Sequence, residues 1–208
     1  MPETRSGVIP RRESPYVARF TRAERAIHYA TAALFLFCIA AAACLYVTPL
    51  AHLVGRRHLV ATVHEWAGVL IPVPVLLGLA SHAFRRDLHE INRFHDGDRE
   101  WLRAGGSDRR RGRFAGKFNA GQKLYASWIA GAVLIMVVTG LLLWNRFSLT
   151  WIPRSGVLFI HDIGFYLLGF GVAGHISKAV GDPEARRGMR TGLVRRTWAR
   201  ETHGQWLG

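Results

Sequence analysis

Two histidines stand near the ends of an almost wholly apolar stretch, FIHDIGFYLLGFGVAGHIS, which covers residues 159–177. In an α-helix the 14 residues from His161 to His175 advance about 21 Å and return to within about 40° of the starting direction. Both imidazoles then project from one side of a single helix at two depths. A neutral imidazole is a metal ligand, so this helix can offer one ligand to each of two stacked centres. The other interpretation is two polar residues of a buried helix, each satisfied by a neighbour.

Four long apolar segments must position these histidines. They cover approximately residues 26–47, 59–84, 124–144 and 156–180, and each is long enough to cross a hydrocarbon layer of about 30 Å as a helix. A soluble bundle is less consistent with the sequence, because its helices normally keep a polar face. Pro72 and Pro74 are expected to kink the second segment. The sequence therefore predicts an all-α fold, an integral membrane four-helix bundle.

The basic residues predict the orientation of this bundle. The formal net charge is +14, and 24 of the 28 Lys and Arg residues fall in residues 1–25, between the second and third spans, or from residue 178 onward. Basic segments stay on the cytoplasmic side of a membrane. We expect a cytoplasmic segment 1–25, a membrane domain 26–180 and a cytoplasmic tail 181–208. Alternation with apolar spans explains the basic charge better than nucleic-acid binding, so no nucleic-acid partner is expected.

The predicted topology pairs four histidines by depth. His28 and His175 fall near the cytoplasmic face, and His64 and His161 fall near the outer face. Ionisable groups in a membrane usually face the bundle interior, where side chains on facing helices build cofactor sites. Two histidines at one depth suit the axial positions of a haem iron, and an iron with both positions filled transfers electrons. His82 is the competing candidate for the inner level.

Other features narrow the kind of cofactor. Cys38 and Cys44 lie in the first span and are expected to pack there, and the absence of CxxCH argues against covalently attached haem. No nucleotide-binding glycine motif is present. Glycines near the four histidines fit close approach of a porphyrin or ordinary helix packing; they are residues 68, 164, 169, 171 and 174. Most of the remaining histidines are expected to be solvated; the remaining histidines are residues 52, 58, 89, 95 and 203.

A second motif, GKFNAGQKLY (residues 116–125), precedes the third span on the cytoplasmic side. The amides of Asn119 and Gln122 are able to hydrogen-bond a quinone carbonyl, with Lys117 or Lys123 nearby for charge. The same spacing fits helix capping, because Asn is a favoured N-cap and Gln three positions later completes a capping box. Spacing alone favours the cap.

These motifs together resemble a known family. The segments RFTRAERAIHY, VATVHEWAG, GKFNAGQKLYASW, MVVTGLLLW, LFIHDIG and GLVRRTWARETH resemble the gamma subunit of membrane-bound formate dehydrogenase, a dihaem cytochrome b. The resemblance implies four transmembrane helices in the bacterial inner membrane. It implies two b haems, the inner held by His28 and His175 and the outer by His64 and His161. It also implies a quinone, menaquinone or ubiquinone, at Asn119, Gly121, Gln122 and His175.

The same resemblance implies how the chain works. An iron–sulfur beta subunit would supply electrons, and a molybdenum or tungsten alpha subunit would oxidise formate, so no residue of this chain is expected to act on formate. The chain would reduce quinone on the cytoplasmic side. Asp162 departs from the family's small apolar residue, and it is a candidate to bond His161 or a haem edge. The alternatives are a cytochrome b subunit of a hydrogenase or thiosulfate reductase, or a membrane anchor or transporter without haem.

Overall fold

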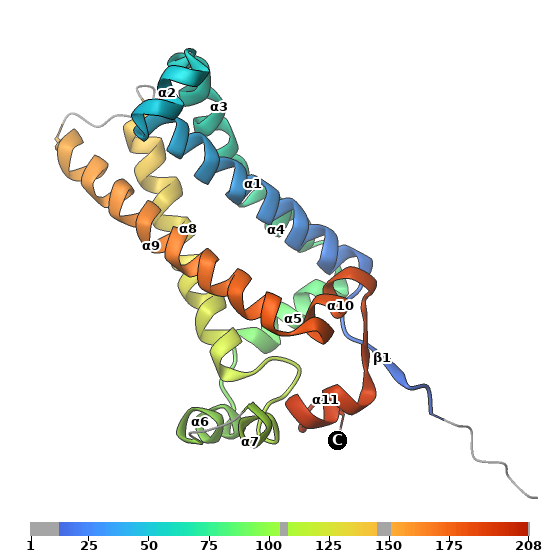
Figure 1. Ribbon diagram of the computed structural model, residues 1–208. Coiled ribbons are helices and arrows are strands. Elements are labelled where there is room, and N and C mark those ends of the chain that lie inside the picture. Colours follow the sequence, from blue (N-terminus) through green and yellow to red (C-terminus); the bar gives the residue numbers. More distant parts are fainter. Residues whose placement is uncertain (1–12, 105–107, 145–150, 208) are drawn as a thin grey trace, which may run out of the picture.

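The computed structural model describes residues 13–104, 108–144 and 151–207, and it confirms the all-α prediction. Within these described ranges, four helical segments are long and apolar enough to cross a membrane, namely α1, α3 with α4, α8 and α9 (Figure 1). The helices are α1 (Arg22–Tyr46), α2 (Thr48–Val54), α3 (Arg57–Leu70), α4 (Val73–Gly78), α5 (His82–Ile91), α6 (Asp96–Arg103), α7 (Asp108–Gly112), α8 (Ala120–Leu143), α9 (Arg154–Gly181), α10 (Pro183–Thr191) and α11 (Arg196–Thr202).

The second span differs most from its expected course. It breaks at Ile71 and Pro72, between α3 and α4, as the prolines predict, since proline removes a backbone donor and crowds the preceding turn. The span ends at Gly78, and the expected end at residue 84 is wrong. The side chain of Ser81 accepts the backbone N–H of Phe84 at 3.4 Å and starts the separate helix α5. The serine cap explains the early end.

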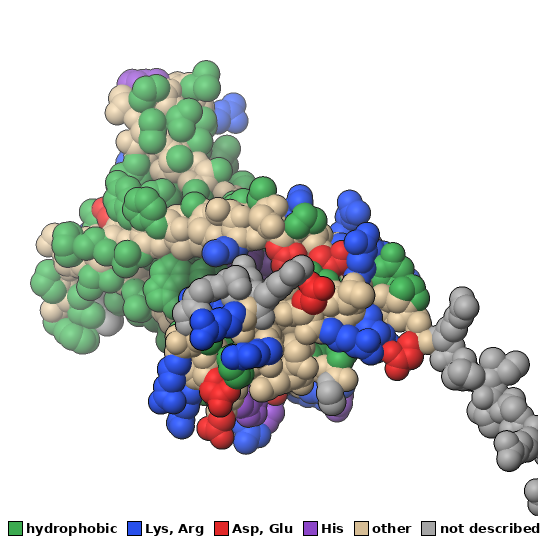
Figure 2. All heavy atoms as spheres, turned by 60° about the horizontal axis from the view of Figure 1, so that its bottom comes forward, with side chains coloured by type: hydrophobic (Ala, Val, Ile, Leu, Met, Phe, Trp, Pro, Cys, Tyr) green, Lys and Arg blue, Asp and Glu red, His purple; other side chains and the backbone are tan. Residues whose placement is uncertain are grey.

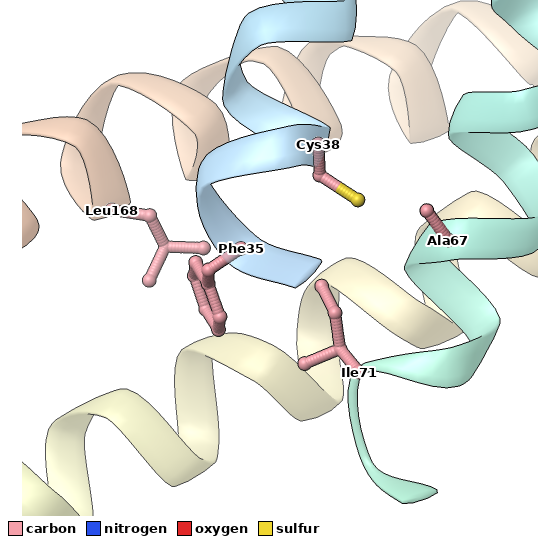
Figure 3. Packing of buried hydrophobic residues seen from close by; sticks show 5 residues of the cluster. All are labelled: Phe35, Cys38, Ala67, Ile71 and Leu168. Carbon is pink, nitrogen blue, oxygen red and sulfur yellow. The ribbon is translucent and has the colours of Figure 1, made fainter. Parts of the chain in front are cut away.

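Mid-depth packing holds the four spans together. Helix α1 packs against α3 and α4, and α8 packs against α9 and α3. A buried cluster joins three of these spans around Phe35, Cys38, Ala67, Ile71 and Leu168 (Figure 3). Leu168 stands midway along α9 between His161 and His175. The cluster therefore forms an apolar layer between the two histidine levels, and Cys38 packs in it as expected.

The polar parts of the chain gather at one end of the bundle. Strand β1 (Tyr16–Ala18) pairs antiparallel with β2 (Leu193–Arg195), so the two terminal segments lie side by side (Figure 1). Helices α6, α7 and α11 join them there. Figure 2 shows charged side chains concentrated over this end, while the rest of the visible surface is largely hydrophobic. The two described terminal segments and the middle segment thus share one end, and its cytoplasmic location stays a prediction.

Candidate functional site

The inner histidine pair joins the first and fourth spans. His28 lies in the second turn of α1 and His175 near the end of α9, and their ring centroids are 6.1 Å apart. Both imidazoles are exposed on the described chain. Imidazole nitrogens bind metals at about 2 Å, so two imidazoles on opposite sides of one metal have centroids about 6 Å apart. The separation of the pair therefore suits two axial ligands of one metal.

The outer pair repeats this arrangement at the other level. His64 on α3 and His161 on α9 have ring centroids 6.4 Å apart, and both are half-buried. The buried Nδ1 of His64 has no hydrogen-bond partner among the described residues. Helix α9 therefore supplies one imidazole to each level. The structure thus brings together His28 with His175 and His64 with His161, the two pairs that were predicted from the depths of these residues in the spans.

A buried threonine sets the tautomer of His161. The Thr139 hydroxyl donates to the carbonyl of Ile135 at 2.7 Å, and its oxygen lies 2.8 Å from Nδ1 of His161. Since the hydroxyl proton is engaged, the oxygen accepts Nδ1–H, and Nε2 keeps its lone pair. A metal-binding histidine typically donates its other ring N–H in this way. Sequence reasoning missed Thr139, although it lies in the quoted motif MVVTGLLLW.

An aromatic ring orients His175 at the inner level. The Tyr125 ring stacks on His175 with centroids 5.3 Å apart and planes 6° apart. Its hydroxyl donates to the carbonyl of Gly171 at 3.3 Å, which ties it to α9. Tyr125 lies in the second turn of α8 and is the last residue of the GKFNAGQKLY motif. It was also missed, and its position one turn after Gly121 was the available signal.

The surroundings of the histidines leave room for a large planar group. Helix α9 packs on α8 but makes few close backbone contacts with α1 or α3, the helices that carry the partner histidines. A side chain built at Gly68, Gly169 or Gly174 would meet nothing within 4 Å. Gly164 and Gly171 instead admit Met136 and Trp128 of α8, which is ordinary helix packing. Helix packing thus accounts for Gly164 and Gly171, and the approach of a porphyrin to Gly68, Gly169 or Gly174 stays a prediction.

The donor set favours iron in a porphyrin over a bare ion. In residues 13–104, 108–144 and 151–207, no group of three or more His, Cys, Asp or Glu side chains is arranged to hold a metal ion. Each level offers two imidazoles, which match the two axial positions left by a porphyrin. The residues present at both levels fit a haem group.

The amide motif forms the helix cap. The Asn119 side-chain oxygen accepts the N–H of Gln122, and the Gln122 side-chain oxygen accepts the N–H of Asn119, both at 2.9 Å. Each carboxamide keeps its NH₂ group as a donor, so capping and ligand binding are compatible. Gly121 faces the ring of Trp101, 3.1 Å from where a Cβ would stand. The glycine thus lets α6 approach α8.

Both lysines of this motif form ion pairs with acidic residues of the middle segment. Lys117 bonds Asp87, with Nζ 2.6 Å from Oδ1. Lys123 is 1% exposed and lies 2.8 Å from Asp98 and 2.8 Å from the carbonyl of Arg93. These contacts attach α5 and α6 to the start of α8. Asp87 and Asp98 of the middle segment thus approach the two lysines, and a charged lysine beside the ligand stays a prediction.

The remaining histidines are either exposed or buried. His82 is exposed at the start of α5, and His52, His58, His89 and His95 are also exposed, as expected of solvated residues. His203 is the exception among them, since it is 3% exposed. Its Nδ1 lies 2.7 Å from the carbonyl oxygen of Gly116. Asp162, singled out as a departure, accepts a hydrogen bond from the Tyr46 hydroxyl at 2.7 Å.

Comparison with known proteins gives the family. The nitrate-inducible formate dehydrogenase cytochrome b556(Fdn) subunit of Escherichia coli (strain K12) is 31% identical over 94 residues, 44% of this chain and 43% of that protein. The formate dehydrogenase cytochrome b556 subunit of Haemophilus influenzae is 30% identical over 95 residues, 44% of this chain and 40% of that protein. The chain therefore spans less than half the length of these relatives. Residues 19–190 match the prokaryotic cytochrome b561 family over most of the chain, and the chain belongs to that family of membrane cytochromes b.

Proposed function

We propose that this chain is the dihaem cytochrome b subunit of a formate dehydrogenase complex, which passes electrons from an iron–sulfur subunit to a membrane quinone. The observation that carries the proposal is one arrangement repeated at two depths. At each level two imidazoles from different helices have ring centroids 6.1 or 6.4 Å apart. Family membership implies haem b. A b haem held by two imidazoles exchanges electrons and offers no open position to substrate.

The chain's own residues have separate roles in this proposal. His28 and His175 hold the inner haem, and His64 and His161 hold the outer one. Thr139 keeps a proton on Nδ1 of His161, which leaves Nε2 for iron. The mid-depth apolar cluster around Leu168 keeps water from the space between the levels.

The quinone site is proposed at the polar end of the bundle. The free NH₂ groups of Asn119 and Gln122 donate to a quinone carbonyl, beside Gly121 and His175. Tyr125 links this motif to His175 by stacking. Reduction of a quinone consumes two protons, and we propose that they come from the cytoplasm, onto which this end faces.

The partners follow from the named relatives. Both are cytochrome b subunits of formate dehydrogenases, which supports an iron–sulfur beta subunit and a molybdenum or tungsten alpha subunit as partners of this chain. A hydrogenase or thiosulfate reductase complex would use the same histidine pairs. Formate and hydrogen are electron donors, so the one that reduces the oxidised cytochrome in membranes identifies a formate dehydrogenase or a hydrogenase. Thiosulfate is an electron acceptor, so reoxidation of the reduced cytochrome by thiosulfate would identify a thiosulfate reductase.

The decisive experiment measures haem per chain and the reduced-minus-oxidised spectrum of the purified protein. The variants are His175→Ala for the inner level and His64→Ala for the outer level, with exposed His82→Ala as the control. We expect two b haems in wild type and in His82→Ala, and one in each ligand variant. Loss of quinol-driven haem reduction in His175→Ala would place the quinone beside the inner level.

Three outcomes would contradict the proposal. Folded wild-type protein that binds no haem would favour the membrane anchor or transporter. Two haems retained in His175→Ala would remove that residue as a ligand. One haem in His82→Ala would give the inner level to His82 instead of His28.

A further inference from the structure

The end of the chain closes over the segment that leads into α8. The backbone N–H of Gly204 donates to the carbonyl of Gly112 at 2.9 Å, and that of Gln205 donates to the carbonyl of Ala115 at 3.0 Å. A Cβ at Gly204 would lie 3.1 Å from the Cα of Arg113, so the two backbones approach closely there. Residues 203–205 thus pack on residues 112–117, shortly before Asn119.

Two buried side chains hold the last carbonyls of this segment. His203 Nδ1 lies 2.7 Å from the carbonyl oxygen of Gly116, and Arg19 Nη2 lies 3.1 Å from that of Lys117. Arg19 Nη2 also lies 3.2 Å from Nε2 of His203. A carbonyl only accepts and a guanidinium only donates, so Nδ1 carries the proton and Nε2 accepts from Arg19. One tautomer of a neutral His203 satisfies both contacts.

Both side chains are fixed from several directions. Arg19 is 4% exposed and His203 is 3% exposed. The Arg19 guanidinium lies 4.8 Å from the centroid of Trp198 and 5.6 Å from that of Trp206, within the range of cation–π attraction. The backbone N–H of Arg19 donates to the carbonyl of Gly192 at 2.8 Å, next to the β1–β2 pair. The N-terminal and C-terminal segments therefore form one rigid support.

We infer that Arg19 and His203 are positioning residues that hold the Asn119–Gln122 motif in its quinone-binding geometry, an inference that rests on the proposed function. The two carbonyls they bind belong to residues two and three positions before Asn119. Ala115 and Ala120 on either side are fully buried, so the segment has little freedom to absorb a change at its anchor. Loss of the anchor would shift the Asn119 carboxamide while leaving both histidine levels in place, because those lie on the long helices.

The test compares His203→Ala, His203→Asn and His89→Ala in the full-length protein in detergent or membranes. Asparagine keeps a donor near the position of Nδ1, and His89 is an exposed histidine at the same end of the bundle. Three quantities are measured: haem per chain, the rate of haem reduction at saturating quinol, and the quinol concentration that gives half this rate. We expect His203→Ala to raise the half-saturating concentration about tenfold, as loss of one buried hydrogen bond to a carbonyl allows. Haem content and saturating rate should match wild type, and His203→Asn should recover part of the loss.

Hydrogen exchange of peptides covering residues 113–124 gives a second readout that does not need quinol. We expect faster exchange there in His203→Ala than in His89→Ala, with unchanged exchange in the centre of α9. An unchanged half-saturating concentration in haem-loaded His203→Ala would overturn the inference. The inference would also fail if His203→Ala lost haem and reduction rate to the same extent and His203→Asn restored neither. A wild-type protein without haem would instead refute the proposed function, so the two failures are distinct.

Discussion

The hydroxyl oxygen of Thr139 lies 2.8 Å from Nδ1 of His161, and the two residues belong to neighbouring helices. Thr139 is 6% exposed and is the hydrogen-bonding side chain of an otherwise apolar turn of α8. The same hydroxyl bonds the carbonyls of Ile135 and Met136 within its helix. Bonds within α8 thus fix the direction of the hydroxyl proton, and the hydroxyl oxygen favours the His161 tautomer whose Nε2 is able to bind a metal.

Replacing Thr139 tests this relationship. We expect Thr139→Val to lower the affinity for the outer haem about tenfold to a hundredfold, the usual range for a lost partner of a metal-binding histidine. Thr139→Ser keeps the hydroxyl and should retain wild-type affinity. Haem titration into the purified apoprotein measures both variants. Equal haem affinity in Thr139→Val and wild type would show that the hydroxyl does not orient the ligand.

The features that sequence predicted depend on short-range periodicity. The four spans follow from long apolar runs, and the break at Pro72 follows from the ring's steric effect. The pairing of His28 with His175 and of His64 with His161 needs only the helix rise and the alternation of span directions. These are properties of one segment or of simple topology, so one sequence suffices to predict them.

The features that sequence missed depend on contacts between distant segments. His203 lies 184 positions from Arg19 in sequence, yet the two side chains meet. Its burial follows from β1–β2 pairing and from two tryptophans, and no local pattern signals it. Lys117 and Lys123 form ion pairs because α5 and α6 fold back against α8, whereas composition indicates only a charged segment there.

The stacking of Tyr125 on His175 predicts how substitutions of Tyr125 affect the inner haem. Its ring is parallel to that of His175 at 5.3 Å. We expect Tyr125→Phe to preserve the stacking and Tyr125→Leu to let the imidazole rotate. Electron paramagnetic resonance of the oxidised protein should then show a shifted low-spin haem signal in Tyr125→Leu but not in Tyr125→Phe. A shift in neither variant would mean that packing elsewhere fixes the His175 plane.

The ion pair between Lys123 and Asp98 predicts a stability effect. Their side chains are 2% and 4% exposed and lie 2.8 Å apart. Removing one member of such a pair leaves an uncompensated buried charge, at a typical cost of about 3–5 kcal/mol. We therefore expect Lys123→Met to lower the thermal unfolding midpoint strongly.

The double variant Lys123→Met with Asp98→Asn is the control for that prediction. The carboxylate of Asp98 accepts the backbone N–H of His95 at 2.8 Å. The Asp98→Asn substitution keeps an oxygen for this bond but removes the charge. Most of the lost stability should return. If the double variant is no more stable than Lys123→Met, the loss comes from the packing of the lysine stem and not from unpaired charge.

The pH dependence of the tail follows from His203. Burial and, secondarily, the Arg19 guanidinium lower the pKa of His203 from 6.5 to about 3. The folded tail therefore holds the neutral imidazole, whereas the released tail binds a proton below its usual pKa of 6.5. The stabilising contribution of His203 is complete above pH 6.5 and is lost progressively as pH falls toward 3.

Asp87 changes the stability of the fold with pH in the opposite direction over part of this pH range. Burial, together with the neighbouring Glu24, raises the pKa of Asp87 from 3.8 to about 6, so the folded state binds a proton there more readily than the unfolded state. The informative quantity is thus the difference between wild type and His203→Asn, in which Asp87 is unchanged. We expect hydrogen exchange of residues 196–207 to accelerate between about pH 7 and pH 5 in wild type, and to change less with pH in His203→Asn after correction for intrinsic rates. If the exchange rates of wild type and His203→Asn changed with pH in the same way, protonation of His203 would not release the tail. Release of the tail would then not change the protonation of His203.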